Sequence, residues 1–384
     1  MLCTVSTVKD GRAGVLRYVE RNLASGADHM FVMLEQDDDG LLDALHEHPH
    51  VTAVLTDDGY WHGAVPANLN VRQVVNADVV NTLLAFVPSV EWLVHLDSDE
   101  CLDLDRDRLT EIPDDVRCIS LEPLEAISKE HWDGEVDRFK RLLDVPDLSL
   151  LAALGAIDVP SNAKYFRGHL QGKLGVRPSL ELTVGVHRVR TRTGESREHF
   201  AADHLRLLHY ESYSGEEFVR KWDAHLSGGH GAGFRAPKTL LRGAIAALQR
   251  NPGLGHAERQ EYLRRIYKRL VEDPVDLLED LGFLVTPDPA LHDRTPVPFP
   301  AEEVRLVESL FGHLVRGPKA PFMAQDDPNA VVELVRSIRS GLGSDEAALA
   351  ERIDAVLPGE TAEVDAAAEA ESDAAEATGL DETL

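Results

Sequence analysis

Residues 92–102 read Trp-Leu-Val-His-Leu-Asp-Ser-Asp-Glu-Cys-Leu, a short apolar run that ends abruptly in acids. An apolar run of this length predicts a buried strand, and Asp97, Asp99 and Glu100 stand where that strand would emerge. In open α/β sheets, ligands bind outside the carboxyl ends of the strands. Two carboxylates one residue apart at such an edge are suited to hold a hard divalent cation, which can in turn bind a diphosphate.

Two plainer interpretations of the acidic segment need weighing. An Asp-rich turn after a strand is often only a solvated loop, and the pattern alone leaves that alternative open. An EF-hand calcium loop needs Gly at its sixth position and Glu at its twelfth. Counted from Asp97, these positions hold Leu102 and Arg108, so the calcium loop is set aside.

The chain before this segment alternates between strand and helix patterns. Strand-like apolar runs fall at residues 2–8, 29–34 and 51–55, and helical spacing of apolar residues falls at 14–25, 41–48 and 71–86. This order predicts an α/β fold with a Rossmann-like, mostly parallel sheet flanked by helices. Further strands are expected at 117–121, 182–186 and 205–210, whereas residues 131–160 show no clear pattern.

The pattern changes to helical spacing in the second half of the chain, which predicts three regions. Residues 1–235 would form the catalytic domain, and residues 236–341 a helical C-terminal extension that includes a Pro-rich connector at 287–300. Residues 342–384 are rich in Ala and acids, with few large apolar residues towards the end. Such a composition buries too little apolar surface to fold, so this tail is expected to be largely disordered.

Composition narrows the classes of function. The formal net charge of −28 would repel DNA or RNA, so we expect no nucleic-acid partner. No run of about 18 apolar residues is present, so no transmembrane segment is expected. The three cysteines (Cys3, Cys101 and Cys118) lack metal-ligand spacing and are few for a disulfide framework, which favours a cytoplasmic location.

Four segments within the first 225 residues contain short motifs whose order and spacing are more specific than any single motif. They are Thr4–Gly11 with residues 23–32 behind it, Arg72-Gln73 with Asn76, Trp92–Glu100, and Leu207–Lys221; Gly172-Lys173, Arg177-Pro178 and His187 lie between the last two. In this order they resemble the family 2-like glycosyltransferases, in particular an Asp-x-Asp-Glu subgroup related to family 92. The chain departs from the family at Gly11, where a Glu is usual, and it lacks the ordinary Glu-Asp base motif.

The resemblance implies a GT-A fold and transfer of a sugar from a nucleotide-diphosphate donor. It also implies a divalent metal, Mn²⁺ or Mg²⁺, because such an ion stabilises the charge of the departing diphosphate. Asp97 and Asp99 are expected to hold this metal, and His209 is a candidate for a further metal contact. A structural role for His209 stays open. Glu100, beside the pair, is either part of the catalytic group or orients the metal ligands.

Nine residues are expected to contact the nucleotide-sugar donor. They are Thr7, Lys9, Asp37, Asp38, Arg72, Gln73, Lys173, Arg177 and Lys221. Lys173, Arg177 and Lys221 would offset the charge of the pyrophosphate, and Thr7 and Lys9 would line the nucleotide pocket. A solvated turn explains the two aspartates about as well, and an exposed helix face explains Arg72 and Gln73 almost as well. A surface role is at least as good an explanation for Lys173, Arg177 and Lys221.

The acceptor and the reaction leave alternatives open. The acceptor is an unidentified glycan, lipid or small molecule, and Glu100, Glu122, Glu125 and Asp137 are all available as its general base. A nucleotidyltransferase of similar fold is a second interpretation. Residues 9–14, Lys-Asp-Gly-Arg-Ala-Gly, weakly resemble the Gly-rich loop with Arg and Lys that such enzymes carry after the first strand. A third interpretation is a degenerate, non-catalytic nucleotide-sugar-binding or interaction protein.

Overall fold

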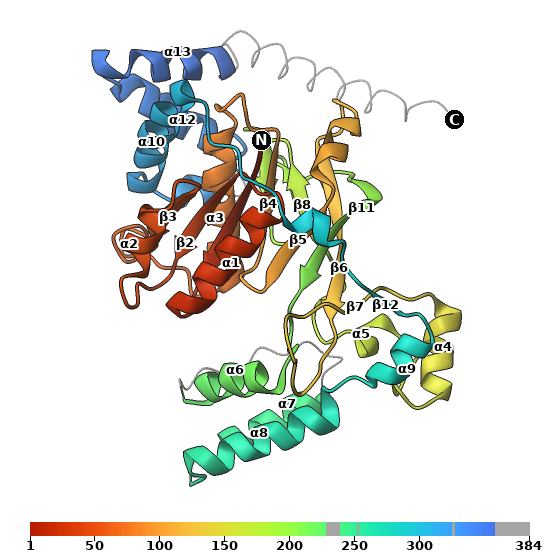
Figure 1. Cartoon of the computed structure of the whole chain (residues 1–384). Helices are drawn as coiled ribbons and strands as arrows, with labels where there is room; N and C mark the ends of the chain where they lie inside the picture. The colour runs from red at the N-terminus through yellow and green to blue at the C-terminus, as the bar shows by residue number, and fades with distance from the viewer. Residues whose placement is uncertain (228–238, 252, 325–326, 358–384) are drawn as a thin grey trace, which may run out of the picture.

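The computed structural model describes residues 1–227, 239–251, 253–324 and 327–357, and Figure 1 shows their arrangement. Within these residues ten strands form one curled sheet, in the spatial order β12-β7-β6-β8-β4-β1-β2-β3, and β11 pairs with both β5 and β6. Helices cover both faces of the sheet, so the predicted α/β fold class is confirmed.

The parallel half of the sheet contains β1 to β4, which pair as β3-β2-β1-β4. Their bounds are β1 (Leu2–Val8), β2 (His29–Leu34), β3 (Val51–Leu55) and β4 (Trp92–His95). Parallel neighbours need a crossover connection. Helices supply it here: α1 (Arg12–Ala24), α2 (Leu41–His46) and α3 (Leu69–Leu84). The carboxyl ends of these strands therefore meet at one edge of the sheet.

Strand β2 contributes to two different cores, because successive side chains of a strand point to opposite faces. Met30 and Val32 join a core with Val15 of α1, whereas Phe31 joins a core with Val80 of α3. A strand buried on both faces is apolar at every position. This is why the sequence shows continuous apolar runs here.

The other half of the sheet mixes strand directions. Strand β8 (Lys173–Val176) runs antiparallel between β4 and β6 (Cys118–Ala126). Strand β11 (Phe200–His209) runs parallel to β6 and antiparallel to β5 (Glu100–Leu104). The first residue of β8 and the last residue of β11 therefore lie at the same edge as the end of β4. The remaining strands are β7 (Phe139–Lys140) and β12 (Leu284–Val285) in the sheet, and β9 (Leu182–Val184) and β10 (Val189–Thr191) in a separate pair.

Two groups of helices lie beyond the carboxyl-end edge, in the lower part of Figure 1. Helices α6 (Gly215–Ser227), α7 (Thr239–Gln249) and α8 (His256–Leu270) share a core that includes Phe218 and Leu263. Helices α4 (Val145–Ala153), α5 (Asn162–Tyr165) and α9 (Val275–Asp280) share another, which includes Leu151 and Tyr165. Short 3₁₀ turns complete the chain: η1 (Arg106–Glu111), η3 (Pro289–His292) and η4 (Ser344–Glu346).

The C-terminal helices pack on the face of the sheet that α3 covers. They are α10 (Ala301–Arg316), α11 (Ala320–Met323), α12 (Ala330–Gly341) and α13 (Ala347–Val356). Leu310 of α10 and Ile353 of α13 belong to the same core as Val80 of α3. Helix α3 is therefore enclosed between the sheet and these helices, which explains why it has buried residues on most of its surface.

Two sequence-based expectations need comment. Residues 347–356, which the sequence places in the tail, form α13, because Leu349 and Ile353 reach the core beside α3. Glu100–Leu104 form the unexpected strand β5, because pairing with β11 continues the sheet there.

The boundary predicted at 235–236 and the tail beyond 357 lie outside the described residues. In the described part of the chain no helix has both the length and the apolar character needed to cross a membrane.

Candidate functional site

The acidic segment forms a turn between β4 and β5 at the carboxyl-end edge of the sheet. The Leu96 amide donates to the carbonyl of Val5 in β1, and the Glu100 amide donates to the carbonyl of Asp97, each at 3.0 Å. The Asp97 amide donates to Glu100 Oε2 at 2.8 Å. The backbone of the turn is thus fixed at both ends, which gives its carboxylates a defined direction.

Asp97 lies between an amide and a cation. Its Oδ1 accepts a hydrogen bond from Gln73 Nε2, and its Oδ2 accepts one from Lys173 Nζ, each at 2.7 Å. Burial alone would raise the pKa of Asp97. The charge and hydrogen bond of Lys173, together with His95 and His169, outweigh burial and hold this pKa well below its usual range. Three residues predicted separately, on α3, β8 and the turn, therefore form one contact group.

Glu100 is enclosed by the same group. Its side chain is fully buried, with Oε1 3.0 Å from His169 Nε2 and Oε2 3.5 Å from Lys173 Nζ. Burial opposes ionisation, yet Lys173 lowers the pKa of this carboxyl below its usual value. Its Oε2 also accepts from the Asp97 amide, so Glu100 supports the turn in this structure. A catalytic role for Glu100 stays a prediction.

Asp99, His209 and Glu211 form a cluster whose possible ligand atoms all lie within 4.8 Å of one another. His209 Nε2 is 3.9 Å from Asp99 Oδ1, and the buried Nδ1 of the same ring has no hydrogen-bond partner among the described residues. Lys221 Nζ lies 3.0 Å from Glu211 Oε2 and 3.9 Å from Asp99 Oδ2. Two carboxylates and an imidazole are a donor set that suits Mn²⁺.

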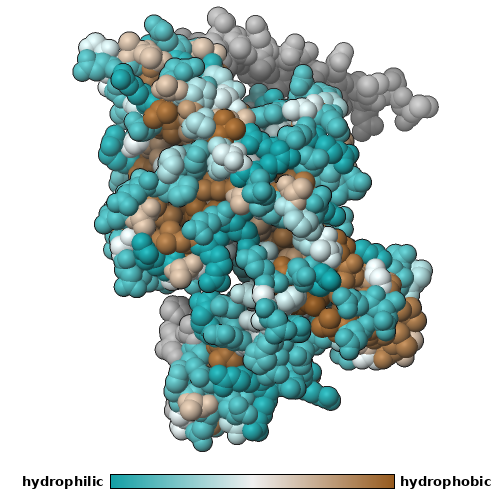
Figure 2. Space-filling model, viewed as in Figure 1, coloured by the Kyte–Doolittle hydropathy of each residue, from teal (hydrophilic) through white to brown (hydrophobic). Residues whose placement is uncertain are grey.

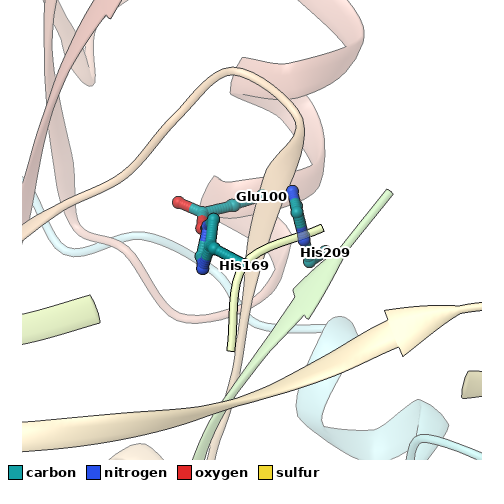
Figure 3. A group of neighbouring side chains, drawn as sticks. All are labelled: Glu100, His169 and His209. Carbon is teal, nitrogen blue, oxygen red and sulfur yellow. The ribbon is translucent and has the colours of Figure 1, made fainter. Parts of the chain in front are cut away.

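Glu100, His169 and His209 form a second, overlapping group, shown in Figure 3. The rings of His169 and His209 stack with centroids 4.6 Å apart and planes 27° apart. His169 Nε2 faces Glu100, and its Nδ1 faces the carbonyl of Gln171. Burial lowers the pKa of His169, but the hydrogen bond to Glu100 and the negative charges of Glu100 and Asp97 together outweigh burial and raise this pKa. Because His169 already bonds to Glu100, the cluster of Asp99, His209 and Glu211 fits a metal better.

The sequence analysis missed His169 and Glu211. His169 follows a stretch without periodic pattern, so no local signal points to it. Glu211 stands two residues after His209, and residues two apart in an extended chain share a face. This spacing is the sequence feature from which Glu211 could have been predicted as a neighbour of His209. His187, named above for its order alone, donates from Nδ1 to the Gly172 carbonyl at 3.0 Å, and the centroid of its ring is 4.6 Å from that of His169.

Thr7 and Lys9 lie at the end of β1, beside the turn. Thr7 Oγ1 accepts a hydrogen bond from Asn76 Nδ2 at 2.9 Å, and Asn76 Oδ1 accepts one from Tyr60 at 2.8 Å. Thr7 is thus held by α3, whereas Lys9 is exposed. Both residues are at the predicted edge of the sheet.

Asp37 and Asp38 follow β2 at the same edge and are exposed. Asp37 Oδ1 accepts from the Leu42 amide at the start of α2, which is an ordinary helix-start contact. Arg72 Nε donates to Glu35 at 2.5 Å, and its Nη1 donates to the Pro66 carbonyl at 2.7 Å. Arg72 therefore holds the 66–72 segment against the end of β2, and it is not directed at the turn.

Arg177 lies at the opposite edge of the sheet. Because β8 runs antiparallel to β4, its last residue reaches the start of β4 and not the acidic turn. The Arg177 guanidinium lies 4.4 Å from the ring centroid of Trp92 and donates to Glu91 at 2.7 Å. The structure therefore places Arg177 away from the acidic turn, and its contact with the donor stays a prediction without support from this geometry.

The other candidate bases have structural partners or lie elsewhere. Glu125 is fully buried, with Oε1 2.8 Å from Lys140 Nζ. The backbone amides of Arg167 and Gly168 donate to its two oxygens. Asp137 pairs with Arg138 at 2.9 Å on the exposed side of the loop before β7. Glu125 is thus part of a buried ion network, with both oxygens already occupied by partners.

Comparison with known proteins adds little to this geometry. No protein-family model matches the chain, and no curated protein matches it. Among solved structures, a mannosyltransferase from Pyrobaculum calidifontis in complex with GDP-mannose and Mn²⁺ aligns with 82% of this chain and 85% of that chain. The alignment has 10% identity and a TM-score of 0.30. Similarity at this level does not assign a function, so the functional inference rests on the site geometry and on the ordered motifs of the sequence.

Proposed function

We propose that the chain is a metal-dependent glycosyltransferase that moves a sugar from a nucleotide-diphosphate donor to an acceptor hydroxyl. The observation that supports this best is the cluster of Asp99, His209 and Glu211, which lies at the edge where the parallel strands β1 to β4 end. In α/β sheets this edge is where ligands bind. The resemblance of the ordered motifs over residues 1–225 points to the same reaction.

Asp99, His209 and Glu211 would hold Mn²⁺ or Mg²⁺ in this proposal. The bound ion would offset the negative charge that develops on the departing diphosphate. Asp97 is assigned a different role from Asp99, because both of its oxygens accept hydrogen bonds from Gln73 and Lys173. Its task would be to fix the turn and keep Lys173 at the edge of the site.

Lys221 would supply a second positive charge. Glu211 raises the pKa of Lys221 against the effect of burial, so this ammonium stays protonated across the physiological range. It lies between two proposed metal ligands, 3.0 Å from Glu211 and 3.9 Å from Asp99. Thr7 and Lys9 at the end of β1, and Asp37 and Asp38 after β2, would line the nucleotide side of the site.

The decisive experiment measures thermal unfolding with nucleoside diphosphates and nucleotide-diphosphate sugars, each with Mn²⁺, Mg²⁺ or EDTA. A ligand at 100 times its Kd stabilises the native state by about 2.7 kcal/mol. We expect one nucleotide class to raise the Tm only with metal, and Asp99→Asn to abolish that rise. Asp115→Asn, which changes an exposed aspartate outside the site, should keep it.

Product analysis completes the test. Release of a free nucleoside diphosphate supports sugar transfer, whereas release of pyrophosphate supports nucleotidyl transfer. If no donor shifts the Tm with either metal, the glycosyltransferase proposal fails and a non-catalytic interaction protein becomes the better description.

A further inference from the structure

Two of the loops around His209 contact one short segment outside the sheet. The first loop is residues 166–172, before β8, and the second is residues 210–214, after β11. The segment that they contact, residues 267–273, contains the end of α8 and the connection to α9; we call it the α8–α9 corner. Its two polar anchors, Tyr267 and Asp273, are almost fully buried. It belongs to the helical C-terminal extension, for which the motifs predict no function.

Asp273 joins the corner to the loop before β8. Its Oδ1 accepts from Arg167 Nη2 at 2.9 Å, and its Oδ2 lies 2.9 Å from Lys140 Nζ. Arg167 Nε also donates to the carbonyl of Val271 at 2.8 Å. The next residue, Gly168, lies directly against the His209 ring, as the position of an added Cβ shows: it would be 2.5 Å from His209 Nδ1.

The network around Asp273 is balanced in charge. Lys140 and Arg167 face Glu125 and Asp273, and the side chains of Lys140 and Glu125 are fully buried. Buried ion pairs contribute little net stability, because desolvation of the charges opposes their attraction. They do impose a specific geometry. Here that geometry is the course of residues 166–169, which carry Gly168 and His169 to His209.

Tyr267 joins the corner to the loop after β11. Its hydroxyl lies 3.1 Å from the carbonyl oxygens of both Ser212 and Lys129. Ser212 has a φ of 53°, a left-handed conformation that a serine rarely adopts, and it follows Glu211 directly. The hydroxyl of Tyr267 therefore holds an unfavourable backbone conformation next to a proposed metal ligand.

We propose that Tyr267 and Asp273 are positioning residues, which set the two loops so that His209 and Glu211 can share a metal ion with Asp99. Neither residue is among the proposed ligands; they act through Arg167 and through the Ser212 carbonyl. The proposal rests on the proposed function for its metal readout. Partners that orient metal ligands typically change affinity on the order of 10–100-fold when they are lost.

The test uses two mild variants of the full chain. Arg167→Met cuts the link to the first loop and leaves Asp273 beside Lys140, and Tyr267→Phe removes only the hydroxyl. The matched controls are Arg138→Met, which cuts an exposed pair with Glu279 of α9, and Tyr262→Phe, which changes an exposed tyrosine of the same helix α8. Mn²⁺ affinity is titrated by the loss of the free-ion EPR signal, well below the Tm of each protein.

We expect both variants to bind Mn²⁺ on the order of tenfold more weakly than the wild type, and both controls to bind it as the wild type does. A role in stability alone would lower the Tm and leave the affinity unchanged, and that result would overturn the proposal.

Hydrogen exchange separates this proposal from the proposed function. One reporter is the amide of Gly168, which donates to the Glu125 carboxylate. The others are the amides of Lys129 and Gly215, which donate to the carbonyls of Tyr213 and Glu130 and so join the second loop to residues 129–130. If the wild type binds no Mn²⁺, the metal-dependent function fails, but the positioning role still predicts faster exchange. We expect this at Gly168 in Arg167→Met and at Lys129 and Gly215 in Tyr267→Phe. Unchanged exchange would refute the positioning role.

Discussion

Gly168 shows how closely the site is packed around a single ring. An added methyl group would fall 2.5 Å from His209 Nδ1 and 2.9 Å from Glu125 Oε2. We therefore expect Gly168→Ala to push His209 away from Asp99 and to weaken Mn²⁺ binding by at least about tenfold. Overpacking should also lower the free energy of unfolding by roughly 1–3 kcal/mol. Calorimetric titration with Mn²⁺ and urea unfolding measure the two effects.

The control for this change is Gly134→Ala, because an added Cβ at Gly134 meets nothing within 4 Å. It should leave both quantities near their wild-type values. Wild-type Mn²⁺ affinity in Gly168→Ala would mean that His209 is not a ligand, and the metal centre would have to be sought elsewhere.

Single residues also show where prediction from sequence ends. The sequence predicts Asp97 and Asp99 as an equivalent pair, but the structure gives them different partners. Lys173, 76 positions further along the chain, binds Asp97, whereas His209 and Lys221 lie near Asp99. Which acid meets which cation depends on the antiparallel pairing of β8 and the register of β11. Neither the strand pairing nor the register can be predicted from the local sequence pattern.

Strand β5 illustrates the same limit for a whole element. Asp and Glu are depleted in strands, so the acids at its start argue against a strand. The strand forms because pairing with β11 places Glu100 opposite His209 and buries Cys101 and Leu102. Tertiary contacts thus override local propensity here. By contrast β1 to β4 and α1 to α3 were predictable, because strands buried on both faces and amphipathic helices leave strong periodic signals.

Helix α10 was predictable as a helix, but its packing against α3 was not. Leu310 is fully buried in the core that also contains Val80 of α3. We expect Leu310→Ala to lower the free energy of unfolding by roughly 2–5 kcal/mol. Because the C-terminal helices and the sheet share this core, unfolding in urea should shift as one transition, seen alike by tryptophan fluorescence and far-UV circular dichroism.

Leu154→Ala is the matched control, since Leu154 is 51% exposed and its loss should cost less than about 0.5 kcal/mol. Two separate transitions, of which Leu310→Ala shifts only one, would contradict a shared core. In that case the helical extension would unfold as a domain of its own, as the division predicted near residue 235 suggests.

The molecule as a whole carries a strong negative charge but also buries several histidines. The net charge of −28 makes the native state self-repelling at neutral pH, and protonation of exposed acids would relieve this repulsion. Buried histidines have the opposite effect on stability. The folded state keeps them neutral, so acid protonates them only in the unfolded chain and lowers the free energy of unfolding. His29 on β2 is the clearest case: it is 6% exposed, bonds to Thr52 at 2.8 Å and packs against Phe299.

The pH dependence of stability should reveal His29 directly. Burial, with a smaller effect of His50, lowers the pKa of His29 from 6.5 to about 3. Between these values the unfolded chain binds a proton at this site and the folded chain does not, so acidification favours unfolding. The loss in the free energy of unfolding should approach about 1.4 kcal/mol per pH unit below 6.5.

We expect the free energy of unfolding in urea to decline less steeply from pH 6.5 to 4 in His29→Gln than in the wild type. His62→Gln, at an exposed histidine, should keep the wild-type slope. Equal slopes in all three proteins would mean that His29 is protonated in the folded state, which its apolar contact with Phe299 and its bond to Thr52 argue against.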